Sequence, residues 1–173
     1  MSDSEAEQFR QFLAGSGDRM FRVALALTGA HHAAEDLLQD ALARTFARWR
    51  HVRGDPEAYV RRAMYHSQVT VWRRRRRLRE LPASSVPDRP DPRDQNAASE
   101  SRLQLRQALM RLGPRQRAVL VARFFEDLSD VETGQLLGCS ASTVRSQTHR
   151  ALARLREIAP ELNGPNTFRE SVK

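Results

Sequence analysis

The sequence predicts an all-α protein made of two small helical domains joined by a flexible linker. In both halves of the chain, apolar residues recur at three- and four-residue steps, as on one face of a helix. No segment shows the strict alternation that marks a strand. Between the halves, residues 82–98 contain four prolines and no periodicity, which indicates a linker. The length of 173 residues suits one ordinary domain or two small ones.

Three helical segments are predicted in the first half. Residues 20–27 are mostly apolar, and residues 31–49 repeat apolar side chains at helical spacing. Pro56 predicts the start of a third helix over about residues 57–77, because proline is favoured in a first helical turn. The side chains predicted to be buried in the last two helices are Ala34, Leu37, Leu38, Ala41, Leu42, Thr45, Phe46, Trp49, Tyr59, Val60, Ala63, Met64, Val71 and Trp72.

Helical patterning resumes in the second half. Apolar residues mark one helix between about 101 and 112 and another over residues 118–125. Ser129 followed by Glu132 is a capping-box pattern, and it predicts the start of a further helix that Gly138 ends. Ser140 or Ser142 caps the last helix. The predicted organisation is a domain over 1–79, a linker over 80–100, a domain over 101–159 and a disordered tail over 160–173.

Positive charge is concentrated in two blocks of a chain whose formal net charge is +8. Residues 51–79 hold nine arginines against two acidic residues, and residues 101–173 are also basic. The stretch 80–100 between them is acidic in net terms. Two basic blocks indicate either two contacts with nucleic acid or two solvated faces.

Several classes of function are disfavoured. A single cysteine, Cys139, rules out an intrachain disulfide and suggests a reducing compartment. No secretory signal or long apolar run is present, so we expect a soluble cytoplasmic protein without a membrane partner. His31, His32, Glu35 and Asp36 have helical spacing, but no further ligand is evident, so no metal is predicted. We find no catalytic or phosphate-binding motif and expect no cofactor, small-molecule substrate or catalysis.

The strongest motif is a helix-turn-helix, in which a turn around Cys139 joins two short helices. In such a motif the second helix enters the major groove, and its polar side chains contact base edges. Arg145 is the best candidate for a guanine contact; the alternative is a helical hairpin with a charged face. The predicted DNA-contacting residues of this helix are Ser142, Thr143, Arg145, Ser146, Gln147, His149 and Arg150.

These segments resemble a known family. Residues 112–157, which include ETGQLLGCS, resemble the promoter −35-binding domain of extracytoplasmic-function sigma factors of the sigma-70 family. AEDLLQDALARTFARW followed by PEAYVRRA resembles the domain of the same family that binds core RNA polymerase and the −10 element. The two blocks occur in the family's order, and their amino-acid sequence is most similar to that of the actinobacterial SigE-like group.

The resemblance implies roles for residues of the first half. Glu35, Asp36, Gln39 and Asp40 match the family's contact region for core polymerase. The helix over 57–77 would bind the −10 element by stacking and a basic track. Many relatives have Asn at the place of His66, which bears on −10 preference, and Trp72 is expected to pack in the core. The residues implied at the −10 element are Arg61, Arg62, Tyr65, His66, Gln68, Arg73, Arg74, Arg75 and Arg76.

The resemblance also implies partners. They are core RNA polymerase and promoter DNA, with an anti-sigma factor common in the family although no motif marks one here. The linker either threads through the polymerase or acts as a tether. A stand-alone helix-turn-helix regulator is the alternative function, and an adaptor that binds only proteins is a third. The 33–77 block favours the sigma factor, because a simple regulator has no need of it.

Overall fold

The computed structural model describes residues 3–77 and 100–160, and for residues 71–77 and 100–102 it describes the backbone alone. Every regular element in these ranges is helical, which confirms the all-α class. The predicted linker and tail lie outside the described residues, apart from their boundary positions. No helix in the described ranges is long and apolar enough to cross a membrane.

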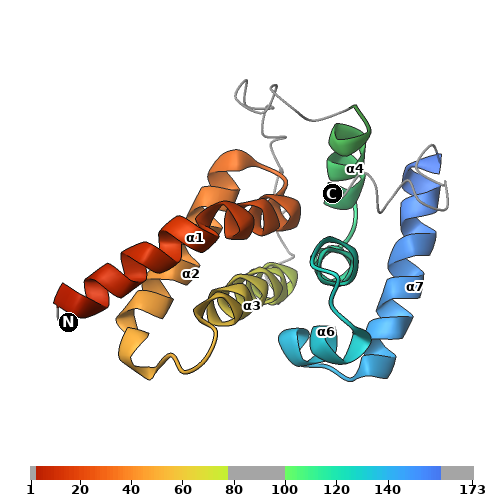
Figure 1. Ribbon diagram of the computed structural model, residues 1–173. Coiled ribbons are helices and arrows are strands. Elements are labelled where there is room, and N and C mark those ends of the chain that lie inside the picture. Colours follow the sequence, from red (N-terminus) through yellow and green to blue (C-terminus); the bar gives the residue numbers. More distant parts are fainter. Residues whose placement is uncertain (1–2, 78–99, 161–173) are drawn as a thin grey trace.

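The first half is a bundle of three long helices (Figure 1). They are α1 (Asp3–Thr28), α2 (His31–Ala47) and α3 (Pro56–Arg77), with the short 3-10 helix η1 (Trp49–His51) after α2. Pro56 begins α3 as predicted. The side chain of Asp55 supports this start, because its Oδ1 accepts a hydrogen bond from the Glu57 backbone N–H at 2.9 Å.

Helix α1 is much longer than the apolar segment that the sequence indicated. Its 26 residues include an N-terminal part in which Phe9 and Phe12 pack against α2 and η1. The ring of Phe9 lies 4.8 Å from that of Phe46 and 5.0 Å from that of Trp49, measured between centroids. Aromatic pairs at such distances stabilise beyond the area that they bury, and they hold this part of α1 in the bundle.

The described part of the second half, residues 100–160, contains four α-helices and one π-helical turn. They are α4 (Glu100–Met110), α5 (Pro114–Leu120), η3 (Val121–Phe125), α6 (Asp130–Leu137) and α7 (Ala141–Ile158). The predicted helix over 118–125 is therefore divided. In η3 the hydrogen bonding widens by one residue, and the Glu126 N–H donates to the Val121 carbonyl at 3.0 Å.

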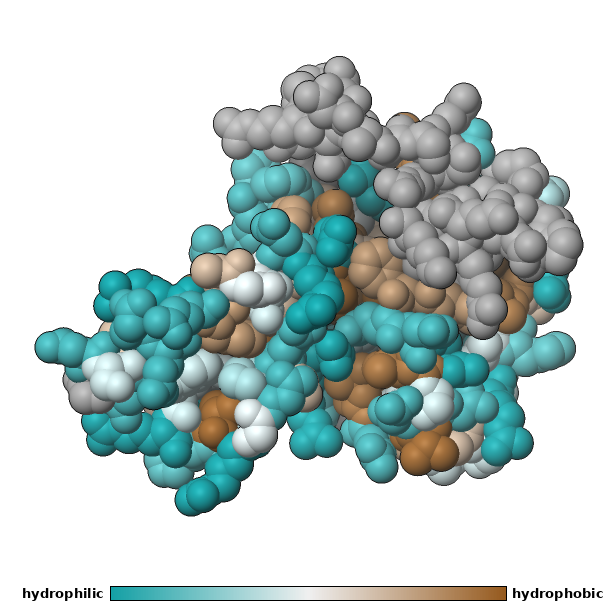
Figure 2. All heavy atoms as spheres, in the orientation of Figure 1, coloured by the Kyte–Doolittle hydropathy of each residue, from teal (hydrophilic) through white to brown (hydrophobic). Residues whose placement is uncertain are grey.

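The two halves share a hydrophobic core. Buried residues of α1, α2 and α3 form one cluster with Ala118 of α5, Val121 and Ala122 of η3, and Leu136 of α6. A second cluster joins α4, α5 and α7 around Leu120, which is fully buried. Helix α3 accordingly lies against α5 and α6 (Figure 1). Hydrophilic residues cover most of the described surface on the face in Figure 2.

Candidate nucleic-acid interface

The helix-turn-helix is built by local signals that the sequence contains. Ser129 caps α6 reciprocally, because its Oγ accepts from the Glu132 N–H at 3.2 Å while Glu132 Oε2 accepts from the Ser129 N–H at 2.8 Å. The predicted capping box is confirmed. Gly138 ends the helix in the left-handed conformation, with φ of 66°, which glycine adopts without steric cost.

The turn packs so closely on α6 that one helix position has room only for a hydrogen atom. A Cβ atom at Gly134 would lie 2.6 Å from the backbone oxygen of Cys139. The Cys139 N–H in turn donates to the Gly134 carbonyl at 2.9 Å. Gly134 therefore fixes how near the turn approaches α6. The sequence indicates no role for this residue, because a glycine inside a helix gives no local sign of what packs against it.

Helix α7 presents one buried and one polar face. Ser140 is its N-cap and accepts a hydrogen bond from the Thr143 N–H at 3.2 Å, which decides between the two predicted capping residues. Val144, Ala151 and Leu155 are buried, and Leu152 is half-buried. The predicted DNA-contacting residues lie on the accessible face: Ser142, Arg145, Ser146, His149 and Arg150 are exposed, and Thr143 and Gln147 are half-buried.

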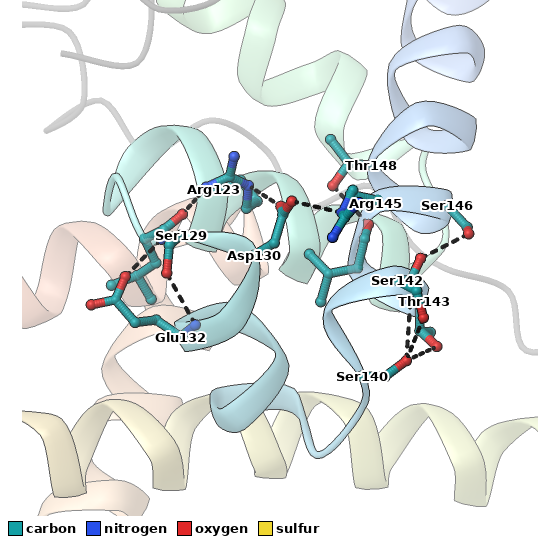
Figure 3. A network of polar contacts seen from close by, with 12 residues as sticks. Arg123, Ser129, Asp130, Glu132, Ser140, Ser142, Thr143, Arg145, Ser146 and Thr148 are labelled. Atoms are coloured by element: carbon teal, nitrogen blue, oxygen red, sulfur yellow. Dashed lines mark hydrogen bonds and ion pairs between the residues drawn. The ribbon is translucent and has the colours of Figure 1, made fainter.

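An ion-pair network connects α7 to α6 and η3 (Figure 3). Asp130, the first residue of α6, contacts Arg145 of α7 with one carboxylate oxygen and Arg123 of η3 with the other. Local sequence patterns gave no sign of this network, because its three members come from separate elements.

A second polar cluster connects the two halves. Tyr65 of α3 is fully buried, and its hydroxyl donates to Glu126 Oε1 at 2.6 Å. Arg61 forms an ion pair with the other oxygen of Glu126 and a second one, at 3.2 Å, with Glu57. Glu57 also pairs with Arg19 of α1. One buried carboxylate from the second half thus binds two side chains of α3.

Burial governs the titration of this cluster. It raises the pKa of Tyr65 well above its ordinary value, and the neighbouring Glu126 raises it further. Burial also raises the pKa of Glu126, although the hydrogen bond from Tyr65 and the charge of Arg61 oppose that rise. These shifts follow from the cost of charge in a poorly solvated site.

Two of the residues predicted at the −10 element, Tyr65 and Arg61, are less accessible than that prediction requires. The prediction that Tyr65 offers an accessible stacking face is wrong in this structure, because the ring lies in the core shared by both halves. Arg61 is bound to carboxylates and its side chain is 24% exposed, so it does not form an open track. By contrast, Arg62 and His66 are exposed and Gln68 is half-buried. The backbone positions of Arg73, Arg74, Arg75 and Arg76 lie in α3, but their side chains, like that of Trp72, lie outside the described part.

The predicted core-polymerase contact lies on the outer face of α2. Asp36, Gln39 and Asp40 are exposed, and Glu35 is half-buried. The Nδ1 atoms of His31 and His32 each lie 3.4 Å from the Glu35 carboxylate. Within the described ranges, no group of three or more His, Cys, Asp or Glu side chains converges as a metal site would require. The face is therefore an accessible acidic surface.

Comparison with known proteins identifies both halves. Residues 15–78 match the family described as Sigma-70 region 2, and residues 108–157 match Sigma-70, region 4. The chain is 40% identical over 172 residues to the RNA polymerase sigma-E factor of Streptomyces coelicolor, and the match covers 96% of this chain and 95% of that one. This chain belongs to the sigma-70 family of RNA polymerase sigma factors.

Other relatives place it among the extracytoplasmic-function sigma factors. It is 32% identical over 152 residues to the ECF RNA polymerase sigma factor SigL of Mycobacterium tuberculosis, with 83% of this chain and 84% of that one covered. Among solved structures, it resembles the sigma factor RpoE from Bartonella quintana, solved in complex with the anti-sigma factor NepR. The TM-score is 0.71 at 22% identity, over 91% of this chain and 99% of that one, which supports the fold.

Proposed function

We propose that this sigma factor binds core RNA polymerase through α2, contacts the −10 element through α3 and recognises the −35 element through α7. The observation that carries the proposal is that the two regions matched to the family occur in one chain, and each presents an accessible polar helix. In this proposal residues 1–79 and 101–159 are the two functional domains, residues 80–100 connect them, and residues 160–173 are a tail.

We also propose that the protein has no catalytic activity of its own. It acts in the cytoplasm as a specificity subunit, and the polymerase forms the phosphodiester bonds. An anti-sigma partner remains part of the proposal, and the Bartonella quintana complex supports that such folds bind one. At the −10 element we now favour Arg62, His66 and Gln68, which are accessible on α3, over the buried Tyr65.

Transcription reconstituted with core polymerase tests the docking surface. Asp36→Arg combined with Asp40→Arg reverses two charges on the exposed face of α2 and disturbs only the 3.6 Å surface pair of Asp40 with Arg44. We expect weaker core binding and fewer run-off transcripts with unchanged folding, since surface pairs contribute little to stability. Asp3→Arg with Asp18→Arg, at exposed positions of α1, is the charge-matched control. Equal effects of both double variants would move the docking surface elsewhere.

Base selection by the polymerase complex tests the −35 contact. Arg145→Ala should weaken binding at a matched −35 site by about 1–3 kcal/mol and relax base choice at one position. An equal loss on every DNA sequence would show that Arg145 contacts only phosphate. Promoter binding by this chain without polymerase, with no affinity for core enzyme, would favour a stand-alone regulator instead.

A further inference from the structure

Asp130 connects the exposed face of α7 to the interior of the second half. One carboxylate oxygen, Oδ1, lies 2.9 Å from Arg123 Nε, and the other, Oδ2, lies 3.3 Å from Arg145 Nε. The side chains of Asp130 and Arg123 are 27% and 28% exposed, whereas that of Arg145 is 73% exposed. In Figure 3 the carboxylate lies between the two guanidinium groups. Asp130 therefore pairs with a partly buried arginine, Arg123, and with an exposed one, Arg145.

The partly buried partner, Arg123, has a further contact with the backbone. Arg123 belongs to the π-helical turn η3, and its Nη1 donates to the backbone carbonyl of Leu128. Asp130 is held at the first position of α6, directly after the Ser129 cap. Both the carboxylate and its anchor are thus attached to backbone of defined geometry. Oδ2 therefore lies beside Arg145 in the protein without DNA.

The ion pair with Asp130 favours side-chain positions that keep Nε of Arg145 beside the carboxylate. An arginine side chain has five N–H donors, one on Nε and four on the two terminal nitrogens. A contact through Nε leaves the terminal donors for another acceptor. A guanine edge presents two acceptors, O6 and N7, and a bidentate arginine contact requires two donors in fixed positions. Holding Nε reduces the number of rotamers that the side chain must give up when it makes that contact.

The same carboxylate opposes DNA binding that lacks the correct base. A negative charge beside the recognition helix repels phosphates and base acceptors alike. Matched and unrelated DNA both meet this repulsion, but only a matched guanine gains from the orientation of Arg145. An aspartate here therefore increases the difference between correct and incorrect sites.

We propose that Asp130 is a positioning residue that determines specificity, holding Arg145 in the orientation in which its terminal donors meet a guanine of the −35 element. The proposal rests on the proposed function, in which α7 recognises that element. Asp130 makes no contact with DNA in this role. It acts through Arg145, and its contribution appears as discrimination between bases.

The test measures base discrimination by the complex of the full chain with core polymerase. Selection from a randomised duplex library first gives the base preferred at each −35 position, and Arg145→Ala identifies the position that Arg145 reads. Affinities are then measured for duplexes with each of the four bases there. We expect Asp130→Asn to reduce discrimination at that position by about three- to tenfold, part of the effect of a whole bidentate contact. Affinity for unrelated DNA should stay the same or rise.

Two comparisons separate positioning from a structural role. Asp127→Asn makes the same chemical change at an exposed position nearby, where φ is 55°, a conformation that asparagine tolerates. It should leave discrimination unchanged. In an Arg145→Ala background, Asp130→Asn should cause no further loss of discrimination. If Asp130→Asn fails to fold, Asp130→Ser carries the same expectation.

The outcomes that overturn the inference differ from those that overturn the proposed function. A uniform loss of affinity for all DNA in Asp130→Asn, or equal losses of discrimination in Asp130→Asn and Asp127→Asn, would overturn the inference alone. So would a preference that Arg145→Ala relaxes and Asp130→Asn does not. A wild-type complex without base preference at any −35 position would overturn the proposed function and the inference with it.

Discussion

Replacing Tyr65 with phenylalanine removes one oxygen atom from the contact between the two halves. The hydroxyl is the donor to Glu126 Oε1 at 2.6 Å, and the side chain of Glu126 is only 6% exposed. The ring, which is fully buried, remains in place, so no large cavity forms. The substitution therefore isolates a single hydrogen bond to a nearly buried carboxylate.

The loss of stability follows from the burial and the charge of the Glu126 carboxylate. A hydrogen bond to a charged group contributes about 1.5–3 kcal/mol to stability, and water has little access to replace the lost donor. Arg61 still pairs with the other oxygen of Glu126, so the carboxylate keeps a partner. We expect Tyr65→Phe to lower the free energy of unfolding by about 1.5–3 kcal/mol, which raises the unfolding constant about 10- to 150-fold.

Urea denaturation of the full chain at pH 7 measures this effect as a lower midpoint at an unchanged slope. Tyr59→Phe is the matched control, since Tyr59 is a half-buried tyrosine on the same helix. It should change stability by less than about 0.5 kcal/mol. Combining Tyr65→Phe with Glu126→Gln should show coupling of about 0.5–3 kcal/mol, as expected for residues in one network. Equal small effects of both tyrosine variants, with no coupling, would refute the reasoning.

Two further predictions concern packing and pH. Gly134→Ala should destabilise the protein by about 1–3 kcal/mol, because the new Cβ would lie 2.6 Å from a turn carbonyl. Gly17→Ala in α1, where the added Cβ would meet no atom from outside its own stretch of helix within 4 Å, should instead stabilise by up to about 1 kcal/mol. Equal stabilisation of both variants in thermal unfolding would contradict this. Because folding raises the pKa of Glu126, the folded state takes up its proton more readily than the unfolded chain. Wild type should therefore gain stability relative to Glu126→Gln as pH falls from 7 to about 4.5, and a relative loss in urea titrations would contradict this.

Local patterns in the sequence predicted the features that local forces determine. The helical spacing of apolar residues in α2, the proline that begins α3 and the reciprocal cap of Ser129 and Glu132 each act within a few residues. The polar face of α7 could be predicted for the same reason, since burial of Val144 fixes which side chains point outward.

Features that depend on distant contacts could not be predicted in this way. Tyr65 has an apolar ring and a polar hydroxyl, so its type suits both a surface and a core. Its ring packs in a core that includes residues of the second half, and its hydroxyl finds an acceptor in Glu126, 61 residues further along the chain. The role of Asp130 depends likewise on Arg123 and Arg145, which come from two other elements. No spacing rule within a single helix connects such residues.

The separation between Tyr65 and Glu126 also has a consequence for synthesis of the protein on the ribosome. At roughly 5–20 residues per second, the chain takes about 3–12 s to grow by the 61 positions from Tyr65 to Glu126. For most of that interval the first half lacks Ala118, Val121 and Ala122, which belong to the same core cluster. Until the second half emerges, the nascent first half therefore exposes apolar surface, and Tyr65 and Arg61 lack their contact with Glu126.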